Sequence, residues 1–275
     1  MLRNVTFGQY YPASSFVHKL DPRIKILLLT AFIVAVFVAN NFAALALVCL
    51  FLLIAIVFSS VSFLSVLRSL KAIIFLVVLT FLLNVFFYAK KEGDTTLFWV
   101  VTKEGVINAT FLASRLLLLV AGSSLLTLTT TPVSLTDGLE SLLKPLSYIK
   151  FPVHELALVM SIALRFIPTL ADETDRIILA QKARGADFDS GNIFRRAKAF
   201  IPVLIPLLVS AFRRADELGN AMDARCYSGS KNRTKYKKLT LTWRDLLAAL
   251  FMAAFVTGIV FTNVYYAQIL SLLGL

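Results

Sequence analysis

Residues 42–58 read FAALALVCLFLLIAIVF, an apolar run without a charge, a proline or a glycine. As a helix, this run is close to the ~20 residues that cross the ~30 Å hydrocarbon core of a bilayer. Three similar runs lie at residues 24–40, 72–88 and 246–267, and a fifth lies within 105–131. The chain has 275 residues, of which 58% are hydrophobic, and its mean hydropathy is +0.80. These values exclude an ordinary soluble domain and predict an all-α integral membrane protein with about five transmembrane helices.

The fifth run is interrupted by Arg115, which is costly at bilayer depth unless it faces protein, water or the interface. The charge-free part of the run, residues 116–131, is marginally long enough to cross alone. One interpretation is therefore an interfacial helix at 105–114 followed by the span. For Arg115 the pattern favours a structural anchor over a substrate contact.

Lysine and arginine near the ends of the runs predict the orientation of the protein. Basic residues precede the first run, separate the second from the third, and are abundant between residues 132 and 244. The turn at Asn40-Asn41 carries no charge, and the loop at residues 90–104 balances acidic against basic residues. We therefore predict a multi-pass protein of the cell (plasma) membrane with its N-terminus in the cytoplasm and its C-terminus outside.

The formal net charge of +12 does not indicate a nucleic-acid partner. The basic residues are spread over the membrane flanks, without the aromatic platforms that single-strand binding uses. The excess of lysine and arginine in the cytoplasmic loops of membrane proteins explains these basic residues better.

The long polar insertion at residues 132–244 divides the chain into three predicted parts. Residues 1–131 would hold about four spans, 132–244 a cytoplasmic or interfacial module of amphipathic helices, and 245–275 the final span. Within the module, residues 153–184 and 193–225 each begin apolar and end charged. This pattern predicts two helices with an apolar stripe on one side. Pro168 and Pro202 most simply kink them.

Each of these two helical pieces ends in a short motif around an arginine. The motifs are Ala183-Arg184-Gly185 and Ala224-Arg225-Cys226. An aspartate, Asp175 or Asp216, precedes the arginine by nine positions in both copies. A guanidinium keeps its charge and fits carboxylates bidentately, so such a tip suits an acidic groove. The plainer alternative is that arginine offsets the helix macrodipole, glycine forms a left-handed cap, and the aspartates pair with arginines a turn away.

Motifs for catalysis and metal binding are missing. The sequence contains no phosphate-binding loop of the Gly-x-x-x-x-Gly-Lys-Ser/Thr type, so ATP energy would have to come from a partner. His154-Glu155 begins like a zinc-protease motif, but Leu158 occupies the position of the second ligand. We therefore expect no enzyme activity, no cofactor and no metal site.

Two further stretches extend the arginine motifs into a family pattern. They are Tyr11-Pro12-x-Ser14-x-x-x-His18-x-Leu20-Asp21-Pro22-Arg23 and Arg165-Phe166-x-Pro168-x-x-x-x-Glu173. Together with the doubled arginine motif, they resemble the transmembrane T component of energy-coupling factor (ECF) transporters, including the related cobalt-transport subunits. The resemblance spans nearly the whole chain. One departure is Cys226, which stands where the family usually has glycine and brings the geometry of the second cap into question.

The resemblance implies a scaffold that links a small membrane-embedded substrate-binding S component to two cytoplasmic ABC-type ATPases. Each arginine motif would insert into a groove on one ATPase, and ATP-driven closure would reorient the S component for uptake of vitamins or other micronutrients. Five residues are assigned possible structural roles in the coupling helices: Arg165, Pro168, Glu173, Asp175 and Asp216. The alternatives are an autonomous secondary transporter, an intramembrane enzyme, or the permease of an ordinary ABC importer.

Overall fold

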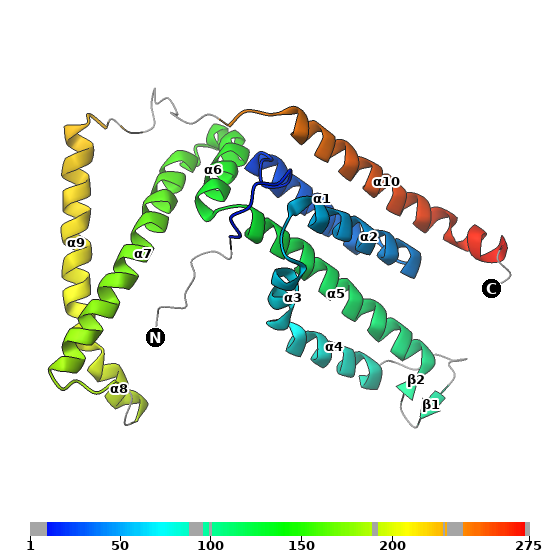
Figure 1. The fold of residues 1–275 in the computed structure, drawn as a ribbon, viewed down its shortest axis with the longest axis horizontal. Helices are drawn as coiled ribbons and strands as arrows, with labels where there is room; N and C mark the ends of the chain where they lie inside the picture. The colour runs from blue at the N-terminus through cyan, green and yellow to red at the C-terminus, as the bar shows by residue number, and fades with distance from the viewer. Residues whose placement is uncertain are drawn as a thin grey trace. The chain divides into compact units, whose positions relative to one another are not determined.

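The computed structural model describes residues 10–87, 96–98, 101–188, 192–227, 229 and 239–272. Figure 1 shows that helices dominate these residues. They form two compact units, and most of the smaller one is Glu140–Lys238. The larger consists of Gly8–Leu139 and Leu239–Leu275. The expected loop at residues 90–104 lies largely outside the described residues.

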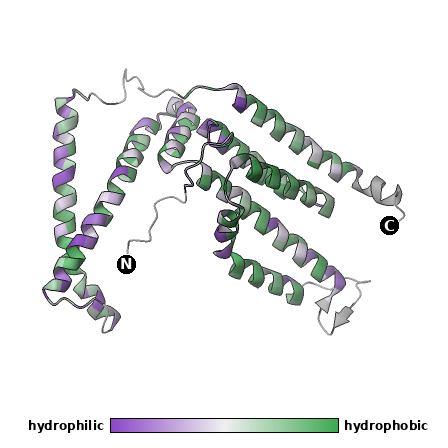
Figure 2. Ribbon diagram, viewed as in Figure 1, coloured by the Kyte–Doolittle hydropathy of each residue, from purple (hydrophilic) through white to green (hydrophobic). Residues whose placement is uncertain are grey.

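The larger unit holds the apolar helices. In chain order these are α1 (Pro22–Val38), α2 (Phe42–Ser59), α3 (Phe63–Lys71), α4 (Ile74–Phe87), α5 (Lys103–Thr129) and α10 (Trp243–Leu272). Two short strands, β1 (Thr96–Phe98) and β2 (Val101–Thr102), pair antiparallel before α5. The chain enters the smaller unit through α6 (Pro132–Leu143), which crosses the boundary. Figure 2 shows α1, α2, α4 and much of α5 and α10 as predominantly hydrophobic.

The core of the larger unit forms where α1, α2, α5 and α10 pack together. Val36, Val48 and Ile259 are fully enclosed there. The rings of Phe51 and Phe255 stack with their centroids 4.1 Å apart. The outer faces of the same helices expose large apolar side chains, as expected for helices surrounded by lipid.

The all-α membrane class is confirmed, with a different set of candidate spans. Four helices of the described chain are long and apolar enough to cross a membrane: α2, α5, α7 (Val153–Ala183) and α10. The pair α3 and α4, bent by 60° at a short break, makes a fifth candidate. Helix α1 has only 17 residues, about 25 Å at the helical rise. The N-terminal part of α7, expected in the coupling module, is apolar enough to join this set.

Helix α5 runs without a break through Arg115, so the expected separate interfacial helix at 105–114 is not formed. The Arg115 Nη2 atom donates a 2.5 Å hydrogen bond to the carbonyl oxygen of Ala39, at the end of α1. The guanidinium also lies 4.7 Å from the centre of the Phe111 ring. Contacts within the protein thus accommodate the arginine, in line with the anchor interpretation.

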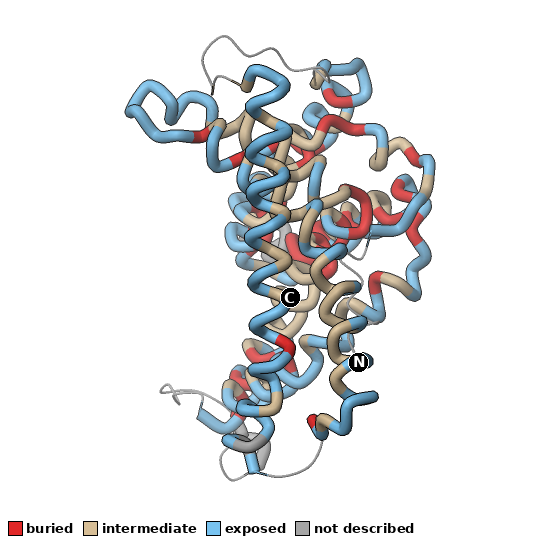
Figure 3. The backbone as a smooth tube through the Cα atoms, turned by 90° about the vertical axis from the view of Figure 1, so that its left-hand side faces the viewer, coloured by how far each residue is buried: buried red, intermediate tan, exposed pale blue. Residues whose placement is uncertain are grey.

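The smaller unit contains η2 (Lys144–Ile149), α7, α8 (Ile193–Ala199) and α9 (Ile201–Ala224). It has little core of its own: the buried residues within its two long helices are Val153 and Ala157 of α7 and Val203 of α9. Exposed and intermediate residues alternate along these helices, as the tube of Figure 3 shows for the face turned to the viewer. Such helices depend on surroundings outside the unit, lipid or protein, to cover their apolar stripes.

Candidate functional site: two arginine caps and the helix pair between them

The first arginine motif forms a complete helix cap. Helix α7 ends at Ala183, and Arg184 is its C-cap residue with φ −86° and ψ 7°. Gly185 follows at φ +87°, in the left-handed region that favours glycine. Its amide donates to the carbonyl of Lys182 at 3.0 Å, and the amide of Ala186 donates to that of Gln181 at 3.0 Å. These two bonds define a Schellman motif, which satisfies the last carbonyls of the helix.

The second motif makes the same two hydrogen bonds. Helix α9 ends at Ala224, and Arg225 is its C-cap residue with φ −93° and ψ 13°. Cys226 lies at φ +55°. Its amide donates to the carbonyl of Asp223 at 2.9 Å, and the amide of the next residue, Tyr227, donates to Met222 at 3.0 Å. Cys226 thus lies in the left-handed region, as Gly185 does, and the cysteine in place of glycine leaves both cap hydrogen bonds intact.

All six residues of the two motifs are exposed: Ala183, Arg184, Gly185, Ala224, Arg225 and Cys226. The Cβ position of Gly185 has open space around it. Each cap therefore presents one arginine between two small residues at the free end of a helix. This arrangement can offer a guanidinium fork to carboxylates on another protein.

The helices that carry the caps differ at their prolines. Pro168 lies inside α7, which remains one helix of 31 residues, and both Pro168 and Arg165 are exposed. Pro202 was expected to kink a helix, but it occupies the first turn of α9, just after the break at Phe200. A proline is tolerated there because the first amides of a helix have no partner within it. The proline inside α9 is Pro206.

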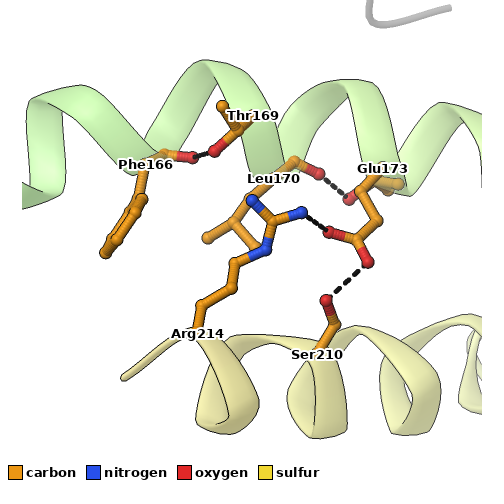
Figure 4. Close-up of polar contacts among 7 residues, drawn as sticks. Phe166, Thr169, Leu170, Glu173, Ser210 and Arg214 are labelled. Atoms are coloured by element: carbon orange, nitrogen blue, oxygen red, sulfur yellow. Dashed lines mark hydrogen bonds and ion pairs between the residues drawn. The ribbon is translucent and has the colours of Figure 1, made fainter. Parts of the chain in front are cut away.

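Glu173 ties α7 to α9 (Figure 4). Its Oε1 atom accepts a hydrogen bond from the Ser210 hydroxyl, and its Oε2 atom accepts one from Arg214 Nη2, both at 2.5 Å. The carboxylate lies in the charged C-terminal part of α7, beyond its apolar stretch. The Ser210 hydrogen bond first, and then the Arg214 charge, hold the pKa of Glu173 below its usual value. Sequence reasoning proposed a structural role for Glu173 but did not identify its partners.

Asp175 and Asp216 form no ion pair with another described residue. Asp175 is half-buried and Asp216 is exposed. Both remain candidates for a structural role.

A second polar cluster lies in the larger unit, where the N-terminal family stretch meets the helix ends. Lys25 Nζ, although buried, donates to the carbonyls of His18 and Thr129 and to the Thr130 hydroxyl, at 3.0 to 3.3 Å. The Asp245 carboxylate accepts from the Asp21 amide at 2.8 Å. Sequence reasoning singled out the stretch at residues 11–23 but missed that it joins the ends of α5 and α10. The only signal was its density of polar residues beside an apolar run.

Within the described residues no group of three or more His, Cys, Asp and Glu side chains could hold a metal ion. The polar features define a class: an all-α membrane protein that presents two capped arginines on a helical module. Comparison with known proteins identifies the family within this class. The family model described as cobalt transport protein, CbiQ, matches residues 13–236.

Relatives named energy-coupling factor transporter transmembrane protein EcfT match almost end to end. The protein from Clostridium kluyveri is 49% identical over 270 residues, covering 98% of this chain and 100% of its own. The one from Ruminiclostridium cellulolyticum is 50% identical over 260 residues, covering 94% and 97%. The one from Bacillus subtilis is 47% identical over 248 residues, covering 89% and 93%. The chain belongs to the EcfT/CbiQ family of transmembrane components of ECF transporters.

Proposed function

We propose that this chain is the energy-coupling scaffold of its transporter, with one ATPase at each arginine cap. The observation that carries the proposal is the duplication of one cap geometry at the ends of two helices. Two equivalent caps suit two equivalent acidic grooves, as on the two ATPase subunits of an ABC-type dimer. Because α7 and α9 are amphipathic and largely uncovered, they also offer a platform for a small membrane-embedded S component.

In this mechanism, ATP brings the two ATPase subunits together, and the bound caps move with their grooves. The helices transmit this motion to the S component, which releases a vitamin or another micronutrient inward. The N-terminus and the coupling module then lie in the cytoplasm and the C-terminus lies outside, in agreement with the distribution of basic residues.

Affinity capture from native membranes tests the proposal. The wild-type chain should recover two ABC-type ATPases and a small membrane protein, whereas R184A/R225A should lose most of the ATPases. Removal of one partner from a desolvated charge pair typically costs about 2–5 kcal/mol. R213A is the matched control, because Arg213 is exposed on α9 and makes no hydrogen bond or ion pair with another described residue.

Equal recovery of the ATPases by R184A/R225A and by wild type would contradict the assignment of the caps. Substrate uptake by the purified chain alone in liposomes would favour an autonomous transporter instead.

A further inference from the structure

Helices α7 and α9 correspond to each other over more than their caps. Residue n of α7 corresponds to residue n + 41 of α9, which aligns Arg184 with Arg225. The same offset aligns Glu173 with Arg214 and Thr169 with Ser210. The two ion-paired residues therefore occupy equivalent positions in the two copies, with opposite charge, and the equivalent residues one turn earlier both carry a hydroxyl.

The contacts between the two helices follow this correspondence. In Figure 4 the helices run in opposite directions: Thr169 precedes Glu173 along α7 from left to right, and Ser210 precedes Arg214 along α9 from right to left. Glu173 contacts its own equivalent, Arg214, and also Ser210. Under the same correspondence, the pair Thr169 and Arg214 is equivalent to the contacting pair Ser210 and Glu173. Thr169 and Arg214 both line one groove of about 550 Å³. Contacts between equivalent residues of antiparallel elements are the property of a two-fold interface.

We propose that Glu173 and Arg214 form a clasp on a local two-fold axis and that this clasp fixes the separation of the two arginine caps. Each clasp residue lies 11 positions before its cap arginine, about 16 Å of helix. Because the helices diverge from the clasp in opposite directions, a small change of their crossing moves both caps. Glu173 and Arg214 are positioning residues that set the geometry of the pair without contacting a partner.

The clasp has the electrostatics that this role needs. The side chains of Arg214 and Glu173 are 34% and 25% exposed, so the pair is screened less than an ion pair in open water. Arg176, on the same helix as Glu173, adds a second positive charge nearby. Its equivalent in α9 is Glu217, again of opposite charge. At these two matched positions the helices carry opposite charges, which favours one register of crossing over others.

The local symmetry makes a sharp prediction for a charge swap. E173R and R214E each place like charges opposite each other, and each should broaden the distribution of cap separations. In E173R/R214E the ion pair is restored with its direction reversed. The carboxylate then lies on α9, and the hydroxyl that can reach it is that of Thr169 in place of Ser210. T169A should therefore harm the swapped chain and spare the wild type, and S210A should do the reverse.

The first measurement is the distance between spin labels on the purified chain. L179C and N220C, exposed and equivalent under the 41-residue offset, would carry the labels in a background without Cys49 and Cys226. The single charge reversals should widen or shift the distance distribution, and the double swap should return it to that of wild type. Unchanged distributions in both singles, or a double swap no better than the singles, would overturn the clasp.

The second measurement separates the clasp from the proposed function on which its role in transport rests. In the assembled transporter, E173R and R214E should retain both ATPases in affinity capture but lose about tenfold in uptake per ATP hydrolysed. The swap should recover uptake to within about twofold of wild type. Full coupling in the single reversals would remove the clasp from the mechanism. ATPase capture by R184A/R225A tests the proposed function of the caps. Its outcome does not depend on the charge reversals at the clasp.

Discussion

Arg184 and Arg225 owe their positions to the residue that follows each of them. Gly185 enters the left-handed region without cost, whereas Cys226 must place its Cβ where an L-residue meets the neighbouring carbonyl oxygen. This conformation costs a non-glycine residue about 1–2 kcal/mol. The second cap therefore contains local strain that the first does not, although both make the same pair of hydrogen bonds.

C226G should stabilise the last turn of α9. The relief of strain, less the added entropy of glycine in the unfolded chain, should amount to about 0.5–1 kcal/mol. G185A should destabilise the last turn of α7 by about 1 kcal/mol, because alanine is strained at a positive φ. A steric clash does not contribute, since no atom lies near the Cβ position of Gly185. Hydrogen exchange at the amides of the two caps measures both effects. Slower exchange in G185A than in wild type would contradict the strain argument.

The helix ends of the larger unit are joined by a buried carboxylate. Asp245, in the first turn of α10, accepts the Thr242 amide at 2.7 Å through Oδ2 and the Asp21 amide at 2.8 Å through Oδ1. Asp21 in turn caps α1 by accepting the amide of Arg23. One side chain thus accepts the amide of the residue just before α10, as in a capping box, and fixes the start of α1 against it.

D245N should destabilise the larger unit almost as much as D245A, by about 1–3 kcal/mol, because the amide NH2 would face an N–H donor. The midpoint of thermal unfolding in detergent, followed by gel filtration, measures the loss. D137N is the matched control, since Asp137 has no hydrogen-bond partner among the described residues. Equal midpoints for D245N and D137N would show that Asp245 does not join the helix ends.

Hydropathy predicted most of the helices because lipid imposes a simple rule: the backbone must bond within the helix, and the side chains must be apolar. The same rule missed α3, because this short helix carries Arg68 and Lys71 and falls in the basic segment between the second and third predicted runs. At the candidate site, the position of the caps was readable from small residues around an arginine. The Glu173 clasp was not, because its partners lie 37 and 41 positions along the chain and only the antiparallel pairing brings them together.

The complete protein combines an apolar bundle with a module that buries little of itself. Exposed side chains on α9 such as Phe212, Val209 and Ile205 are typical of surfaces that contact lipid or another protein. The two long helices of the module end in the same pair of cap hydrogen bonds. This repetition supports our proposal that the chain couples energy and that another component selects the substrate.

The ratio of substrate uptake to ATP hydrolysis, in the transporter reconstituted into proteoliposomes, tests this assignment most directly. We predict that R184A and R225A each lower the ratio by about tenfold or abolish ATPase binding, and that R213A leaves it unchanged. Both caps should matter, because closure of the ATPases must move both helices. Uptake and coupling close to wild type in R184A/R225A would contradict the account, since the two caps would then carry no force between the ATPases and the membrane.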